Sequence, residues 1–192
     1  MQSRCCSILL RLTMVKTNSG PHHPHHIYSD NTWYFITAAV YQRRPLLKEP
    51  KHKTYVREQM KSLTAEFRLH LSAWVILDNH YHVLVKLSNG LELSRLVARL
   101  HGSTSYILNK ELGLPGRKFW NNYWDVCVNG EGSYWRHFNY IHHNPVKHGY
   151  VDRMENWEFS SYCWYLQHKG LEWLNDTFMR YPIIDYSTRL DI

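Results

Sequence analysis

The chain has 192 residues, a length typical of one domain with short extensions. Its 23 Lys and Arg against 16 Asp and Glu give a formal net charge of +7, and its 44% hydrophobic residues are enough for a folded core, which argues against intrinsic disorder. No apolar run approaches the roughly 20 residues of a membrane-spanning helix, so we expect no membrane partner.

The rarer residue types narrow the setting and the class of partner. Four cysteines cannot build the dense disulfide framework of a small secreted domain, which favours a reducing, cytoplasmic location. The 14 His, 14 Tyr and 8 Trp, combined with the basic charge, are typical of surfaces that bind phosphates and stack bases. A basic globular protein with an aromatic core explains this composition equally well.

The first half of the chain alternates strand and helix signals. Residues 1–31 show no ordered pattern, and we expect an unstructured N-terminal extension. β-Branched and aromatic residues predict a strand over 33–41, and a basic loop follows over 43–53. Apolar residues at helical spacing predict a helix over 53–67, and strict alternation predicts a second strand over 69–77.

The second half repeats the pattern and adds one helix. Asp78-Asn79 is a turn signal that leads into a returning strand over 80–87. Apolar spacing predicts a second helix from Leu93 to near Gly113. A further strand is expected over 118–128, and a third helix over 131–144.

This order of elements predicts an α+β protein of the ferredoxin-like, or split βαβ, plan. In that plan an antiparallel sheet has two helices on one face, and the extra third helix is free to cover the other face. We expect one domain over residues 32–165 and a C-terminal extension over 166–192, whose aromatic residues can pack back onto the body.

Two histidines on the predicted strand 80–87 are candidate metal ligands. His80 and His82 point to one face because a strand has a period of two, whereas Tyr81 points to the other. Imidazoles about 7 Å apart along a strand can share one ion if their rings tilt together. A His-x-His pair is unspecific in so histidine-rich a chain, and two edge histidines without a ligand role are an open alternative.

The third helix carries a second candidate pair. Tyr140 and Asn144 lie four residues apart and therefore share one helix face. Pro145 removes a backbone donor, so we expect the helix to end or kink at Asn144 and to free its side-chain carbonyl as a ligand. The alternative is a core tyrosine followed by a capping asparagine.

These residues resemble those of a known family. His80-Tyr81-His82 is similar to the HUH motif, histidine–hydrophobe–histidine, although Tyr81 is bulkier than the residue usual there. Two segments of the third helix, Asn139-Tyr140-Ile141 and Asn144-Pro145-Val146-Lys147-His148-Gly149, resemble the active-site helix of REP-associated tyrosine transposases. These enzymes are relatives of the small single-tyrosine insertion-sequence transposases. The resemblance covers about residues 32–165 and implies the HUH endonuclease fold.

The resemblance implies a specific reaction. A free tyrosine hydroxyl has a pKa near 10, so only about one in a thousand is ionised at neutral pH and it needs activation. A divalent ion on His80, His82 and Asn144 would polarise a phosphate and direct it toward Tyr140 as nucleophile. A His/amide set also suits zinc, but the resemblance implies Mg or Mn. The products are a 5′-phosphotyrosine and a free 3′-OH, with no nucleotide cofactor.

The implied partner is single-stranded DNA that folds into a palindromic hairpin, cleaved beside that hairpin. The candidate DNA-binding residues are basic or aromatic: Arg43, Arg44, Lys118, Trp120, Arg136, Lys147 and His148. We expect a cytoplasmic, nucleoid-associated enzyme, either a monomer or a homodimer that exchanges its tyrosine helix. The alternatives are a catalytically inactive or domesticated relative that only binds hairpins, and an RNA-binding module of the RRM type, whose Lys/Arg-Gly-Phe/Tyr string is missing.

Overall fold

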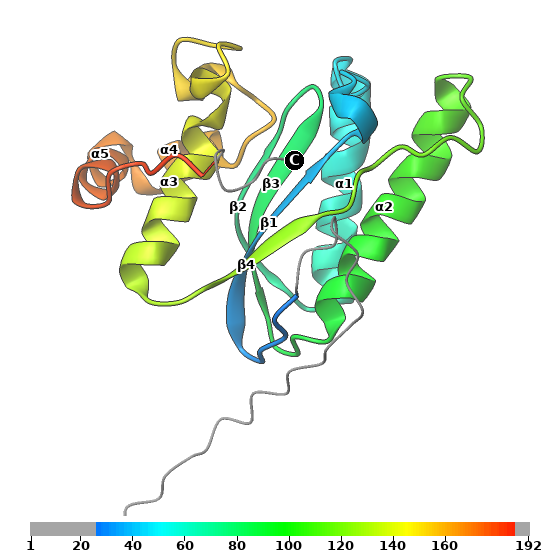
Figure 1. Cartoon of the computed structure of the whole chain (residues 1–192). Helices are drawn as coiled ribbons and strands as arrows, with labels where there is room; N and C mark the ends of the chain where they lie inside the picture. The colour runs from blue at the N-terminus through cyan, green and yellow to red at the C-terminus, as the bar shows by residue number, and fades with distance from the viewer. Residues whose placement is uncertain (1–25, 187–192) are drawn as a thin grey trace, which may run out of the picture.

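The computed structural model describes residues 26–186, which form a four-stranded sheet between two layers of helices (Figure 1). Every strand pairing is antiparallel, and the spatial order is β2-β3-β1-β4. The strands are β1 (Thr32–Ala39), β2 (His70–Ile76), β3 (His80–Leu87) and β4 (Trp124–Val128). This is the ferredoxin-like order, so the predicted fold class is confirmed.

The helices divide between the two faces of the sheet. One face is covered by α1 (Pro50–Glu66) and α2 (Glu92–Glu111). The other is covered by α3 (Glu131–Lys147), α4 (Tyr162–Lys169) and α5 (Leu171–Arg180) (Figure 1). Two 3-10 turns, Tyr41–Arg43 and Met154–Asn156, lie between these elements. Within residues 26–186, none of the helices combines the length and the apolar character that crossing a membrane requires.

Both faces of the sheet are buried, which explains the dense apolar sequence of its central strands. On β1, Tyr34, Ile36 and Ala38 belong to the core beneath α1 and α2. Phe35 points the opposite way into the core beneath α3. The period of two therefore assigns successive residues of one strand to two separate cores.

The fourth strand is shorter than the sequence predicts. The expected strand began at residue 118, but regular pairing with β1 starts only at Trp124. The preceding residues join the sheet only through an isolated bridge between Val40 and Trp120. Trp120 is instead held against α2, where its Nε1 donates to Thr104 Oγ1 at 2.9 Å, and this draws the chain away from the ladder.

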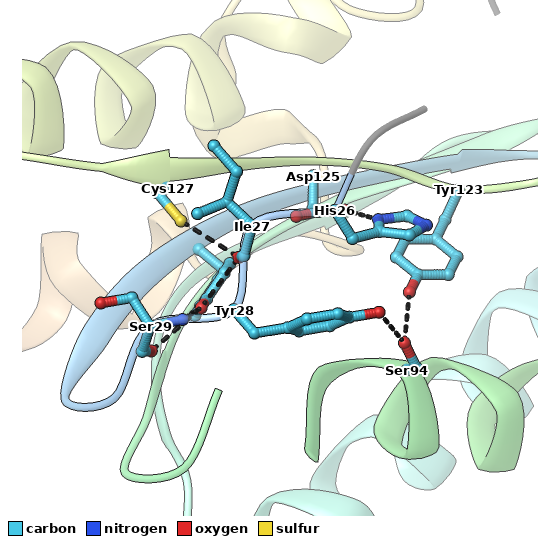
Figure 2. A network of polar contacts seen from close by, with 9 residues as sticks. His26, Ile27, Tyr28, Ser29, Ser94, Tyr123, Asp125 and Cys127 are labelled. Carbon is cyan, nitrogen blue, oxygen red and sulfur yellow. Dashed lines mark hydrogen bonds and ion pairs between the residues drawn. The ribbon is translucent and has the colours of Figure 1, made fainter. Parts of the chain in front are cut away.

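Residues 26–29 pack on the domain, whereas the rest of the predicted N-terminal extension before them lies outside the described residues. His26 pairs with Asp125 of β4 and stacks on Tyr123 at 4.7 Å between ring centroids (Figure 2). Tyr28 bonds Ser94 of α2 at 2.8 Å through its hydroxyl (Figure 2). The network fastens this segment to both β4 and α2.

The predicted C-terminal extension contains helical structure. Its expected start at residue 166 falls inside α4, and α5 follows directly. Trp173 of α5 contacts Trp135 of α3 at 5.7 Å between ring centroids, which is the packing back onto the body that the aromatic residues suggested. Residues 187–192 lie outside the described range, and both domain boundaries stay predictions.

Candidate active site

The histidine pair begins β3 and points toward α3. His80 and His82 are 4% and 3% exposed, and their ring centroids are 5.0 Å apart. Tyr81 faces the opposite core, where its hydroxyl lies 2.9 Å from His101 Nε2. The predicted division of this strand between its two faces is confirmed, and it places both imidazoles close enough to act on one ligand.

Each imidazole is oriented by a polar neighbour on its Nδ1 atom. Asn79 donates its Nδ2 to the carbonyl oxygen of Arg43 at 3.0 Å, so its side-chain oxygen accepts from His80 Nδ1 at 2.7 Å. The hydroxyl of Thr37 on β1 lies 2.6 Å from His82 Nδ1 and is buried. These contacts direct the Nε2 atoms of both rings toward α3. The sequence analysis missed Thr37 and treated Asn79 only as a turn residue.

Asn144 of α3 supplies a third polar atom. Its Oδ1 lies 3.3 Å from His80 Nε2. Burial is the main cause that lowers the pKa of His80 to about 3, so the ring is neutral and carries one N–H, which is directed to Asn79 at the shorter distance. His80 Nε2 and Asn144 Oδ1 therefore face each other as two acceptors, an arrangement that a shared cation would stabilise.

The second histidine of this group also suits a cation. Within the described part of the chain, His82 Nε2 is buried without a hydrogen-bond partner, whereas Asn144 Nδ2, also unpartnered, is a hydrogen-bond donor, so only Oδ1 of that amide can bind a cation. Burial, assisted by the neighbouring His80, lowers the pKa of His82 well below its ordinary value, so its ring is also neutral. No group of three or more His, Cys, Asp or Glu side chains able to hold a metal ion occurs in residues 26–186, so an amide must complete the set. Neutral imidazole nitrogens and an amide oxygen are acceptable donors for a divalent ion.

The sequence predicted that the third helix ends or kinks at Asn144, and an end at that residue is wrong. The helix continues through Pro145 to Lys147, and Asn144 lies in its last turn rather than at its end. The carbonyl of Asn144 accepts a hydrogen bond from His148 N at 3.0 Å, which closes that turn despite the proline. Asn144 reaches His80 because α3 crosses the sheet above β3, and not because the backbone is released there.

Tyr140 lies one turn before Asn144 and faces the same histidines. Its ring centroid is 5.4 Å from that of His82, and the residue is 3% exposed. Lys147 Nζ lies 5.1 Å from the centre of the same ring. Tyr134, the other tyrosine of α3, instead bonds Ser72 on β2 through its hydroxyl at 2.5 Å and serves packing.

The C-terminal end of the described chain contacts the tyrosine. Tyr186 stacks on His137 at 4.3 Å between ring centroids and approaches Tyr140 edge-on at 5.2 Å. Asp185 accepts a 2.5 Å ion-pair hydrogen bond from Lys147 Nζ. The motif on α3 gives no signal for these contacts, because they come from residues far along the chain.

The candidate DNA-binding residues do not gather at one place. Near the histidines lie His148, whose ring is 5.1 Å from that of His80, and Arg43, whose charge helps to lower the pKa of His80. The remaining charged candidates Arg44, Lys118 and Arg136 are exposed, whereas Lys147 is partly buried. Trp120 is 5% exposed and packs on His101, so the faces of its ring are closed to a base.

The basic loop after the first strand is shorter than the sequence predicts. Helix α1 already begins at Pro50, so Lys51 and Lys53 belong to it. Lys53 is 3% exposed and donates to Asp78 Oδ1 at 2.7 Å and to Lys48 O at 2.8 Å. This pair stabilises the turn before His80, while Arg43, Arg44 and Lys48 remain exposed.

A ferredoxin-like sheet with a histidine pair at one end and a tyrosine helix across its second face is the architecture of single-tyrosine HUH transposases. The family described as "Transposase IS200 like" matches residues 28–144. The chain belongs to this family of transposases, which are enzymes that nick DNA and transfer the cut strand.

Individual relatives carry a more specific description. A REP-associated tyrosine transposase of Escherichia coli (strain K12) is 27% identical over 133 residues, 68% of this chain and 76% of that protein. A putative REP-associated tyrosine transposase of Haemophilus influenzae is 28% identical over 143 residues, 67% of this chain and 78% of that protein. A solved structure of a REP-associated tyrosine transposase bound to a REP hairpin is 22% identical, covers 78% of this chain and 87% of that chain, and gives a TM-score of 0.66. This structural likeness confirms the fold. The family match and these relatives together confirm the resemblance to REP-associated tyrosine transposases that the sequence suggested.

Proposed function

We propose that this protein is a metal-dependent single-stranded DNA endonuclease and strand transferase that forms a 5′-phosphotyrosine through Tyr140. The observation that carries the proposal is the convergence of His80, His82 and Asn144 on one point beside the Tyr140 ring. Within the described residues, His82 Nε2 is a buried ring nitrogen without a hydrogen-bond partner, and its ring lies beside that of Tyr140.

In this reaction Tyr140 forms one bond and one bond breaks. The phenolic oxygen loses its proton and bonds to phosphorus, and the bond from phosphorus to the 3′ oxygen breaks. That oxygen takes up a proton and leaves as a free 3′-OH. The energy of the broken bond is kept in the covalent link, so the strand can be rejoined without a nucleotide cofactor.

The metal-binding residues have a separate role. His80, His82 and Asn144 would hold a divalent cation, Mg or Mn, and such an ion supplies Lewis-acid activation of the scissile phosphate. Thr37 and Asn79 fix the orientation of the two rings, and burial keeps them neutral, the state in which imidazole binds a metal.

The proposed substrate is single-stranded DNA carrying a palindromic hairpin. The solved relative of this fold is bound to a REP hairpin, and this chain carries a net charge of +7 with Arg43 and His148 beside the histidine pair. Such a charge supplies affinity for phosphates. A DNA substrate of this kind implies action in the cytoplasm at the nucleoid.

The proposed site residues lie together within one chain, which supports a monomer. Tyr140 faces the histidines of its own sheet, with α3 packed on β2 and β3. Mixing Tyr140→Phe with His80→Ala tests this point. If one chain suffices, the mixture stays inactive, whereas exchange of the tyrosine helix between two chains restores one working site per dimer.

A covalent adduct tests the proposed chemistry. A labelled single strand with a hairpin is incubated with protein and Mg or Mn, and we expect an adduct that survives SDS. Tyr140→Phe should abolish the adduct and leave binding near that of the wild type. Tyr134→Phe is the matched control on the same helix and should keep the adduct. Binding without an adduct in the wild type would instead identify a protein that only binds hairpins.

A further inference from the structure

A groove lies at the C-terminal end of α2, apart from Tyr140. Its volume is about 450 Å³, within the range of pockets that hold small ligands. Ser105, Tyr106, Asn109 and Lys110 of α2 form one side, and residues 115–117 form the other. Neither the family resemblance nor the proposed reaction assigns a role to this groove.

The groove has a fixed shape because the loop that forms its second side is bonded to the helix. Asn109 is 6% exposed and donates its Nδ2 to Arg117 O at 2.7 Å. Leu114 N donates to Asn109 O at 2.7 Å. Gly116 adopts a φ of +74°, a conformation that other residues rarely take, and this allows the chain to turn there.

The chemistry of the lining suits an unpaired nucleotide. Tyr106 is 71% exposed, which leaves its ring open to a stacking partner. Lys110 and Arg117 are exposed, and within residues 26–186 no acidic side chain lines the groove or pairs with them. The nearby Glu111 is ion-paired with Lys51. An exposed aromatic ring between cations is how proteins hold single strands without reading their sequence.

Basic and aromatic residues connect the groove with the histidine pair. Lys118 follows Arg117, and its Nζ lies 5.0 Å from the centre of the Tyr41 ring. Arg43 lies two residues beyond Tyr41, and its positive charge contributes to lowering the pKa of His80. The C-terminal end of α2 and the start of β3 lie at the same end of the sheet (Figure 1).

We propose that this groove is a second DNA subsite, in which Tyr106 stacks on an unpaired base of the strand that extends from the hairpin. Lys110 and Arg117 contact the flanking phosphates. This inference rests on the proposed function, because it places the same substrate on the protein. It also moves the stacking role from Trp120 to Tyr106, which follows Thr104 by two residues and so points away from the sheet.

Fluorescence anisotropy on labelled hairpins tests the subsite. The hairpins carry no extension, or a short or a long single-stranded extension on the 5′ or the 3′ side. Tyr106→Ala should weaken binding of one long-extension hairpin by about 5- to 150-fold, the range of one lost base–aromatic stack, and leave the unextended hairpin unaffected. Tyr106→Phe should restore binding. Trp164→Ala, which removes a 53% exposed aromatic from α4, is the control and should change nothing.

The salt dependence gives an independent measurement. Lys110→Ala and Arg117→Ala should each flatten the slope of log K against log salt by about 0.7 on the long-extension hairpin alone. Unchanged affinity of Tyr106→Ala on every extended hairpin, or an equal loss on the unextended one, would overturn the subsite. A wild type that forms no adduct, but whose long-extension affinity depends on Tyr106, would overturn the nuclease function and keep the groove.

Discussion

Replacing Thr37 with valine is expected to weaken binding of a divalent cation while the protein stays folded. Thr37 is 3% exposed, and its hydroxyl lies 2.6 Å from His82 Nδ1. Valine keeps the shape of the side chain but removes the hydroxyl, so a buried ring nitrogen loses its partner. The ring of His82 is then no longer held with Nε2 toward Asn144.

The expected magnitudes follow from this geometry. One buried ring nitrogen without a partner costs about 1–3 kcal/mol of the free energy of unfolding. Removing an orienting partner of a metal-binding histidine typically weakens the affinity for the metal by about 10- to 100-fold. Urea denaturation in EDTA measures the first quantity, and calorimetric titration with Mn²⁺ measures the second.

Thr104→Val is the matched control for this variant. Thr104 is also fully buried, and its hydroxyl accepts a hydrogen bond from Trp120 Nε1 at 2.9 Å. Valine at this position again leaves one buried ring nitrogen without a hydrogen-bond partner. Thr104 lies on α2, on the opposite side of the sheet from the histidine pair. A similar loss of stability with unchanged metal affinity is expected. Equal metal affinity in Thr37→Val and the wild type would refute the orienting role of Thr37.

His80→Ala and EDTA treatment should each stop cleavage with little change in circular dichroism, and cleavage in a metal-free buffer would contradict the metal site. Burial lowers the pKa of His101 to about 3. The unfolded chain therefore binds the extra proton first, and this histidine lowers stability as the pH falls from about 6.5 toward 3, by up to about 1.4 kcal/mol per pH unit. The urea concentration at the midpoint of unfolding should fall less steeply with decreasing pH for His101→Gln than for the wild type. Parallel curves for the two proteins would contradict this role of His101. The double variant Arg43→Ala, Arg44→Ala should flatten the salt slope of DNA binding by about 1.4 without changing which hairpin is chosen, whereas an unchanged slope would assign the attraction to other cations.

The sheet and the faces of its strands could be predicted from the sequence because their signal is local. Alternating apolar residues fix which side of a strand is buried, so His80 and His82 could be placed opposite Tyr81. The order of strands and helices then left the ferredoxin-like plan as the simplest arrangement. Tyr140 and Asn144 shared a helix face for the same reason, since their spacing matches one turn.

Other features depend on packing that local patterns do not contain. Pro145 predicted a helix end, but the helix continues for part of a turn and is closed by the bond from His148 to Asn144. Trp120 alternates with its neighbours as a strand residue would, yet its indole N–H is drawn to Thr104. In both cases a contact made elsewhere in the fold outweighed a correct local preference.

The orienting role of Thr37 shows where such prediction reaches its limit. Thr37 on β1 lies directly opposite His82 on β3 in the antiparallel ladder. The alternation of β1 specifies which face Thr37 occupies, but a slip of two residues would keep that face and bring another side chain to His82. The register is set by the turns and by packing on both faces, and these involve residues throughout the chain. The sequence could therefore indicate the proposed metal ligands, whereas the partner that orients one of them required the structure.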